Sequence, residues 1–384
     1  MLIMRAKAVI YLDRFTENIK SVKTRIGKNR HICVPVKADA YGHGAVQIAK
    51  AALAAGASCF GVAAVTEGAA LRKAGIKTPI LLFSQPSPDE IAEIISADLT
   101  PFVSDTEFAD TLNEYAKKAR KKISVHIKID TGMGRIGCNI KDAKELALHI
   151  KKLPCINLTG TGTHLAVSDS ISRNDIDYTK KQISGFKRAV NAIRAAKINP
   201  GIVHAANSGA VILHPSAWFD MVRPGILLYG YKSVEEYTAP LDQLKKLSKF
   251  RKLTAAPVME LQGSVVLIKK IKKGGSVSYG RTWIADKDTL IGVLSVGYAD
   301  GLPRLASNRW QVVIGGELYP LVGRISMDQC CVNLGKKTKV KRWDTAVIFG
   351  SPEHTASALA KITGTIPYEI TCNVNKRVPR VYKH

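Results

Sequence analysis

Long uncharged apolar runs are missing from this sequence of 384 residues. The opening stretch MLIMRAKAVIYLDRF carries charges at Arg5, Lys7 and Asp13, so it lacks the apolar core of a secretory signal peptide. No stretch elsewhere is long enough to cross a bilayer as a helix. We therefore expect no membrane association and a cytoplasmic location.

Cysteine pairs that would suggest a metal site or a disulfide framework are also missing. The seven cysteines are an odd number and none belongs to a CxxC pair. The neighbours Cys330 and Cys331 are poorly placed to bond to each other. We interpret the thiols as incidental to a reduced protein. Because no cluster has the spacing of metal ligands, we expect no metal.

Acidic residues are scarce, with 31 Asp and Glu against 57 Lys and Arg, which gives a net charge of +26. A chain this basic could bind nucleic acid or an anionic surface. Its basic segments are dispersed, however, and no RNA-binding signature or helix-turn-helix pattern accompanies them. The charge therefore indicates a solvated basic surface, and specific nucleic-acid binding is the weaker alternative.

From residue 31 to about 230 the sequence alternates between short apolar runs and amphipathic stretches such as 44–56, 105–122 and 186–197. Eight such units in series predict an α/β fold, a (β/α)8 barrel of the TIM type. The predicted strands are HICVPVKA, ASCFGVAAV, TPILLFS, LTPFVSD, ISVHIKIDTG, NLTGTGTHLA, IVHAANSG and MVRPGILLYG.

After about residue 245 the runs, among them YEITCNVNKRVPRVY, become strand-like and are punctuated by Gly and Pro, which predicts a mostly β C-terminal domain. Only HTASALAKIT, residues 354–363, has a helical pattern. The predicted domains are therefore 1–245 and 246–384. Residues 1–12 are a candidate further strand of the second domain.

The active site of such a barrel lies where its strands end. Polar residues at the predicted ends are mostly cations, amides and hydroxyls, which suits an anionic, phosphorylated ligand. The segments AANSGA and VRPGI favour phosphate binding by backbone N–H groups, although Asn207 and Ser208 could simply cap a helix. Lys37 ends the first strand, and a partly desolvated lysine can form a Schiff base. A Schiff-base lysine near a phosphate site suggests pyridoxal phosphate; an ordinary surface lysine is the alternative.

Motifs along nearly the whole chain resemble the alanine racemase family, the fold-type III pyridoxal-phosphate enzymes. The resemblance follows the family's order through both predicted domains. The motifs are VKADAYGHG, IKIDTGMGRIG, GTHLA, HAANSGA, RPGILLYG, SVSYGRTW, GYADGLPR, GRISMDQ and PYEITCNVNKRVPRVY.

The resemblance implies a role for each matched residue. Lys37 and Tyr279 would be the two catalytic bases, with Tyr279 reaching into the barrel of a partner subunit. Arg135 and the backbone of Met327 would contact the substrate, and Lys128 matches a lysine that is carbamylated in many members. The residues that would bind pyridoxal phosphate are Lys37, Tyr41, His164, Asn207, Ser208, Arg223 (facing the pyridine nitrogen), Gly225, Ile226 and Tyr368.

Plain structural alternatives remain for several of these residues. Tyr279 could be an ordinary strand tyrosine, and His164 could be a hydrogen-bonded core histidine. Arg223 could form an ion pair with Asp220. Lys128 could pair with Asp130, because alternation places both on one face of a strand.

The resemblance implies interconversion of L- and D-alanine, with D-alanine supplied for peptidoglycan. Because its two bases would come from different chains, we expect an obligate homodimer with shared sites. A serine, lysine or broad-specificity racemase and a related decarboxylase are alternatives, with Tyr298 and Arg304 as candidate substrate filters. A non-catalytic pyridoxal-phosphate carrier on the same barrel is disfavoured, because such proteins usually lack the β domain.

Overall fold

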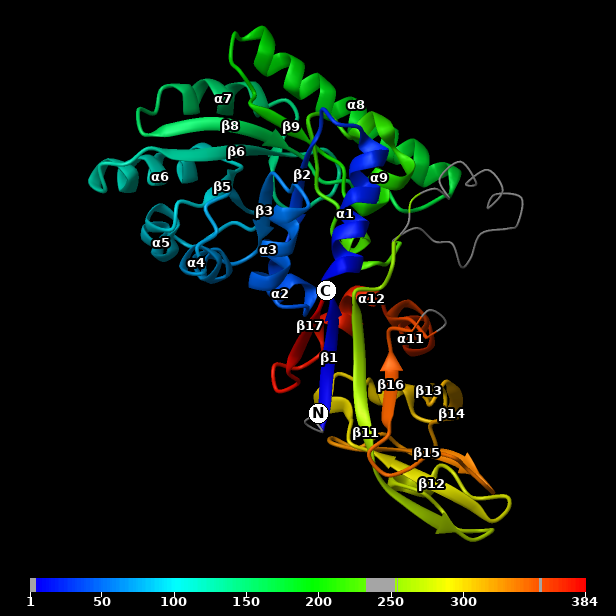
Figure 1. The fold of residues 1–384 in the computed structure, drawn as a ribbon. Helices are drawn as coiled ribbons and strands as arrows, with labels where there is room; N and C mark the ends of the chain where they lie inside the picture. Colours follow the sequence, from blue (N-terminus) through cyan, green and yellow to red (C-terminus); the bar gives the residue numbers. More distant parts are fainter. Residues whose placement is uncertain (1–4, 233–252, 254, 352–353) are drawn as a thin grey trace. The chain divides into compact units, whose positions relative to one another are not determined.

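The computed structural model describes residues 5–232, 253, 255–351 and 354–384. The chain divides into two compact units (Figure 1). We call residues 15–40 and 45–255 the barrel unit, and residues 1–14, 41–44 and 256–384 the β unit. The predicted boundary at 245/246 lies outside the described residues.

Eight parallel strands close into a barrel, which confirms the predicted fold class. Each strand pairs with the next along the chain, and β10 pairs with β2 to complete the ring. A short strand, β7 (Cys138–Asn139), adds to the edge of β6. The barrel strands are β2 (His31–Pro35), β3 (Cys59–Val62), β4 (Ile80–Leu82), β5 (Thr100–Val103), β6 (Ile123–Asp130), β8 (Ile156–Gly162), β9 (Ile202–His204) and β10 (Met221–Val222).

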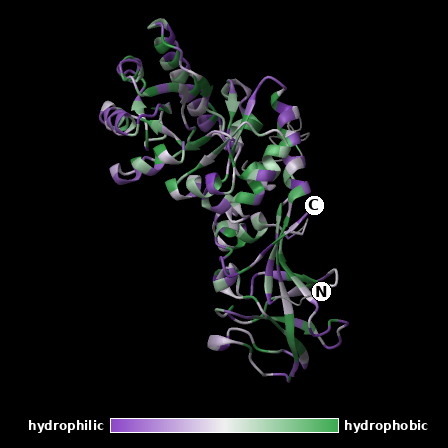
Figure 2. Ribbon diagram, turned by 60° about the vertical axis from the view of Figure 1, so that its left-hand side comes forward, coloured by the Kyte–Doolittle hydropathy of each residue, from purple (hydrophilic) through white to green (hydrophobic). Residues whose placement is uncertain are grey.

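Helices cover the outside of the strands (Figure 1). Their polar and apolar residues alternate along the chain (Figure 2), as expected for helices that pack one face on a barrel. Side chains fix several helix starts: Asp105 accepts a bond from Phe108 N at 2.8 Å. The helices are α1 (Leu12–Ile26), α3 (Ala45–Ala54), α4 (Val65–Lys73), α5 (Ile91–Ser96), α6 (Thr106–Lys118), α7 (Ala143–Lys151), α8 (Arg173–Ala195) and α9 (Ser208–Leu213). Within the described residues, none of the helices has the length and apolarity needed to cross a membrane.

Two glycines on β8 make room for polar rings inside the barrel. A Cβ at Gly160 would lie 2.4 Å from Cε1 of His126, and one at Gly162 would lie 2.3 Å from Cε1 of His204. Because residues two apart on a strand face the same side, both glycines line the same space. Two positions of β8 are thus occupied by glycine, which leaves space for the rings of His126 and His204.

The β unit is built around the long strand β11 (Met259–Ile271), which pairs antiparallel with β1, β12 and β16. The N-terminal strand β1 lies between β11 and the C-terminal strand β17, to which it is parallel. Both chain ends are thereby tied into one sheet. Its strands are β1 (Ala6–Tyr11), β12 (Thr289–Leu294), β13 (Gln311–Ile314), β14 (Glu317–Pro320), β15 (Cys330–Gly335), β16 (Thr345–Phe349) and β17 (Arg380–Lys383).

One strand prediction in this unit is wrong. The run YEITCNVNKRVPRVY reads as extended, but Pro367–Cys372 forms the helix α12, and only Arg380–Lys383 is a strand. Pro367 occupies the first turn, where its missing N–H costs nothing and its fixed φ suits a helix. The other helix, α11 (Ala356–Thr363), lies inside the predicted helical segment.

Candidate active site

Cationic side chains gather around His164, just beyond the end of β8. Burial holds the pKa of this half-buried imidazole well below its ordinary value. Nearby positive charges lower it further, in the order Lys128, Arg223, Arg135 and Lys37. Lys37 follows β2, Lys128 and Arg135 lie on and after β6, and Arg223 follows β10. Parallel barrel strands end on one side. The predicted strand-end residues of the barrel unit therefore do come together, around an imidazole that is neutral at physiological pH.

Arg223 follows β10 and is 6% exposed. Its Nη2 donates to the carbonyl oxygens of Thr163 at 2.7 Å and Ala205 at 3.3 Å, and its Nη1 donates to Nδ1 of His204. Burial lowers the pKa of Arg223 to about 10, so the guanidinium stays charged at neutral pH. Asp220, considered above as its ion-pair partner, instead accepts a bond from Val203 N at 2.8 Å.

A second histidine continues this chain of hydrogen bonds. Because Nδ1 of His204 accepts from Arg223, its proton lies on Nε2 and is donated to Nδ1 of His126, 2.9 Å away. Burial, aided by the charge of Arg223, lowers the pKa of His126 to about 3. The same causes hold the pKa of His204 well below its ordinary value. Two neutral imidazoles thus orient one buried cation.

Lys128 lies on β6 with its Nζ 4.8 Å from the centre of the Phe102 ring. Burial, then the charges of Arg223 and Arg135, lower the pKa of Lys128 well below its ordinary value. The neighbouring Asp130 is engaged elsewhere: its carboxylate accepts four backbone N–H bonds from residues 132–135, at 2.8 to 3.2 Å. Asp130 therefore shapes the loop that carries Arg135.

The predicted phosphate residues lie at the start of α9 and after β10. Asn207 is the N-cap of α9, and its Oδ1 accepts from Ala210 N at 3.0 Å and from Ser168 Oγ at 2.6 Å. The buried Ser208 hydroxyl accepts from Gly225 N at 2.9 Å and from Leu227 N at 3.2 Å, so it ties the two segments together. The capping role of Asn207 is real, and it aligns the N–H groups of this first turn.

The segment directly after Lys37, labelled α2 (Lys37–Tyr41), is a left-handed turn. The φ angles of Ala38, Asp39, Ala40 and Tyr41 lie between +51° and +56°. This conformation costs an L-residue about 1–2 kcal/mol, or about 4–8 kcal/mol for four in a row. Hydrogen bonds offset part of that cost, among them the bond from Ala40 N to Val36 O at 2.8 Å. Nothing in the letters ADAY predicts it.

Tyr41 and Tyr368, both predicted phosphate contacts, belong to the β unit and lie together there. Their ring centres are 5.8 Å apart and the rings are tilted by 55°. Nδ1 of the buried His43 lies 2.9 Å from the Tyr41 carbonyl oxygen. The tyrosine pair is thus a preformed feature of this unit.

Tyr279 and Met327, also in the β unit, are large side chains left 70% and 52% exposed. Tyr279 begins the short turn Tyr279–Arg281, and Ser278 before it bonds to Arg324 O at 2.5 Å. The backbone of Met327 accepts from Ala299 N at 3.0 Å. This bond brings the GYADG segment, with the candidate filter Tyr298, beside the predicted substrate contact.

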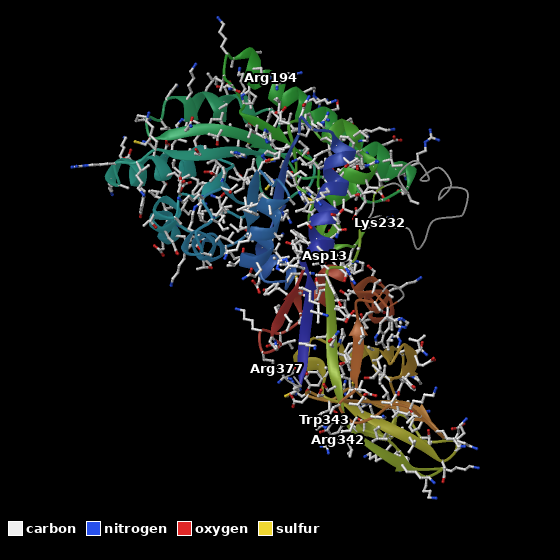
Figure 3. The ribbon with its side chains drawn as sticks, viewed as in Figure 1. Asp13, Arg194, Lys232, Arg342, Trp343 and Arg377 are labelled. Atoms are coloured by element: carbon white, nitrogen blue, oxygen red, sulfur yellow. The ribbon has the colours of Figure 1, made fainter. Side chains whose placement is uncertain are left out.

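A buried carboxylate holds these two loops of the β unit. Asp300 accepts from Arg5 at 2.7 Å, from Arg377 at 2.9 Å and from Gly297 N at 2.9 Å. Arg377, labelled in Figure 3, also donates to Asp328 at 2.8 Å. Two arginines from opposite ends of the chain thereby fix the loops that carry Tyr298 and Met327.

Comparison with known proteins accounts for both units. Residues 10–233 match the family signature described as the N-terminal domain of alanine racemase, and residues 258–382 match the one described as its C-terminal domain. The chain belongs to the alanine racemase family. The resemblance inferred from the motifs is therefore confirmed over nearly the whole sequence.

Relatives and solved structures in the alanine racemase family cover the full length. The alanine racemase of Treponema denticola is 52% identical over 386 residues, which is 99% of this chain and 98% of the relative. That of Treponema pallidum is 42% identical over 98% of both chains. The solved alanine racemase of Clostridium difficile 630 is 35% identical, with a TM-score of 0.91 over 100% of this chain and 97% of that chain.

The alanine racemase family uses pyridoxal phosphate, and the residues at the barrel end fit that group. The cations that act on His164 would offset a phosphate ester and a substrate carboxylate. Arg223 is a buried and permanently charged donor, suited to an acceptor nitrogen on the cofactor ring. Small residues at the start of α9 and after β10, joined by the Ser208 hydroxyl, form the compact polar surface that a phosphate needs.

Sequence reasoning missed two residues that bear on the site. His126 carries the hydrogen-bond chain behind Arg223, and its alternation with Lys128 on β6 could have indicated an inward ring. Glu67 bonds to Ala38 N at 2.6 Å, beside Lys37. Its sequence signal is only that of a glutamate in the first turn of a helix.

Proposed function

We propose that this protein is a pyridoxal-phosphate-dependent alanine racemase that works with two bases. One observation carries the proposal: Lys37, Arg135 and Arg223 act electrostatically on His164 at one end of the barrel, in a chain that is 52% identical to an alanine racemase over 99% of its length. Bound at Lys37, the cofactor would supply an electrophilic carbon at which the substrate amine replaces the lysine amine, and a ring that withdraws electrons from the substrate α-carbon. In bacteria the product D-alanine would serve peptidoglycan synthesis.

The chain's own residues would hold the cofactor at several points. Lys37 would bind it covalently. The phosphate would be held by Asn207, Ser208, Gly225 and Ile226 of the barrel unit and by Tyr41 and Tyr368 of the β unit. His164, neutral through burial, would lie beside the ring as an uncharged surface.

Arg223 would face the ring nitrogen as a donor that does not give up its proton. Nδ1 of His204 accepts a hydrogen bond from Arg223, so this nitrogen carries no proton. His204 therefore cannot supply a proton through Arg223 to the ring nitrogen of the cofactor. A ring nitrogen left unprotonated withdraws electrons less strongly, and this limits side reactions such as transamination. The hydrogen-bonded chain behind Arg223 thus favours simple proton exchange.

Proton transfer would be divided between Lys37 and Tyr279. A single base tends to return a proton to the face from which it came, whereas two bases on opposite faces invert the centre. Arg135 and the Met327 backbone would hold the substrate carboxylate and orient the α-carbon between them.

The surroundings of Lys128 favour carbamylation of its amine. A lysine reacts with carbon dioxide only through its neutral amine, and burial together with Arg223 and Arg135 favours that form. The resulting carbamate would be anionic and would orient Arg135.

The proposal includes an obligate homodimer with shared sites. Tyr279 would act in the barrel of the partner subunit, which agrees with its 70% exposure in the single chain. Met327 is similarly exposed, at 52%. Exposed residues that are predicted to act on the substrate, Tyr279 through its side chain and Met327 through its backbone, are what a site completed by a second chain requires.

The test is racemisation by the purified chain, followed with a coupled D-amino-acid oxidase assay. L-alanine should be converted, and Lys37→Ala should lose both the absorption band of lysine-bound cofactor and nearly all activity. A panel of L-serine, L-lysine and other amino acids separates the alternatives. Faster turnover of any of these than of alanine would replace the proposed substrate, and carbon dioxide release would indicate a decarboxylase.

A further inference from the structure

Glu67, in the first turn of α4, uses its two carboxylate oxygens for different purposes. Oε1 accepts from Ala38 N at 2.6 Å. Oε2 accepts from Ala63 N at 2.8 Å and from Ala64 N at 3.1 Å. The second oxygen therefore caps the start of α4, and the first reaches across to the residue that follows Lys37.

Ala38 is the first residue of the left-handed turn. An unfavourable backbone conformation persists only where surrounding groups over-determine it. Part of that support is local, because Oδ1 of Asp39 accepts from Ala45 N at 2.8 Å. The bond from Ala38 to Glu67 is different in kind, because it ties the turn to the next strand–helix unit of the barrel.

We propose that Glu67 is a positioning residue for Lys37: by anchoring Ala38 it holds the left-handed turn that sets the direction of the lysine. This inference rests on the proposed role of Lys37 as the cofactor lysine. The anchor is a charge-assisted hydrogen bond, which is stronger than a neutral one. Without it, the segment after Lys37 is free to relax toward an ordinary right-handed or extended backbone, and the amine loses its fixed direction.

The two roles of Glu67 can be separated by Glu67→Gln. An amide has one oxygen, and two N–H groups of Ala63 and Ala64 compete for it against one at Ala38. The amide oxygen should therefore stay with the cap of α4, and the NH2 group should face the Ala38 N–H, where it can accept nothing. Glu67→Ala removes both roles and is the comparison.

Glu90 offers a matched control. It also caps a helical turn from the third position, because its Oε2 accepts from Ser87 N at 2.8 Å. Glu90→Gln makes the same chemical change, and the bonds of Glu90 are to Ser87 rather than to the segment that follows Lys37.

The experiment compares hydrogen–deuterium exchange in the full-length protein and its variants, read on peptides that cover residues 37–44 and 65–73. In Glu67→Gln we expect exchange in 37–44 to rise about tenfold, as for the loss of one strong hydrogen bond, with less than a twofold change in 65–73. Glu67→Ala should accelerate both segments, and Glu90→Gln should accelerate neither. The dissociation constant for pyridoxal phosphate, measured by absorbance titration, should rise about tenfold in Glu67→Gln. It should not rise in Glu90→Gln.

Unchanged exchange in 37–44 in Glu67→Gln, or equal acceleration of both segments, would overturn the anchor and leave Glu67 as a helix cap only. If exchange rises but the affinity for pyridoxal phosphate does not fall, the positioning role fails while the proposed function stands. If the native chain takes up no pyridoxal phosphate, the proposed function fails and the positioning role fails with it.

Discussion

Replacing Ala38 with glycine should stabilise the protein or leave its stability unchanged, although the same change in an ordinary helix is destabilising. Ala38 has φ +51° and ψ +49°, and its side chain is exposed, so almost no packing is lost. Glycine removes the left-handed cost of about 1–2 kcal/mol. It adds an unfolded-state entropy cost of about 0.5–1 kcal/mol. The net expectation is a gain of about 0–1.5 kcal/mol in the free energy of unfolding.

The matched control is Ala70→Gly, at an exposed position inside the right-handed helix α4. That change should cost about 1 kcal/mol. The two variants should therefore differ by about 1–2.5 kcal/mol in urea unfolding followed by circular dichroism, which is well above the error of a paired midpoint comparison. If Ala38→Gly is as destabilising as Ala70→Gly, the turn after Lys37 is not left-handed in solution.

Three further results are expected from the barrel interior. A histidine whose folded pKa is depressed contributes stability that is present above its unfolded pKa of about 6.5 and is lost as the pH falls through it. Below that point, His126, His164 and His204 should each lower the free energy of unfolding by about 1.4 kcal/mol per pH unit. His126→Asn should therefore reduce the slope of this free energy against pH by about 1.4 kcal/mol per pH unit. An unchanged slope would mean that His126 is not buried and neutral. Gly162→Ala should cost about 1–3 kcal/mol in urea unfolding, because its Cβ would meet the bonded ring of His204, and a neutral result would contradict the packing. Arg223→Leu should raise the measured pH midpoint of the buried imidazoles in a histidine NMR titration, because the charge of Arg223 is one cause of their lowered pKa values; an unshifted midpoint would contradict this.

The strands of the barrel could be predicted because their apolar runs alternate regularly with amphipathic helices. Lys37, His164, Arg223 and their neighbours could be selected because they follow those runs. The left-handed turn could not be predicted, because Ala38–Tyr41 contains no glycine and part of the turn's support is the bond from Ala38 to Glu67, which is distant in the sequence. The helix α12 was missed because the β-branched residues of the run outweighed the signal of Pro367. His126 was missed because a lone histidine on a strand has no spacing that marks its partner.

The two-base assignment is tested most directly by running the reaction of Tyr279→Phe in D2O and following the α-hydrogen of each alanine enantiomer by NMR. If Lys37 and Tyr279 act on opposite faces, the variant should exchange the α-hydrogen of one enantiomer only and should form almost none of its mirror image. Exchange of both enantiomers, or inversion at a rate near that of the unmodified chain, would contradict the account.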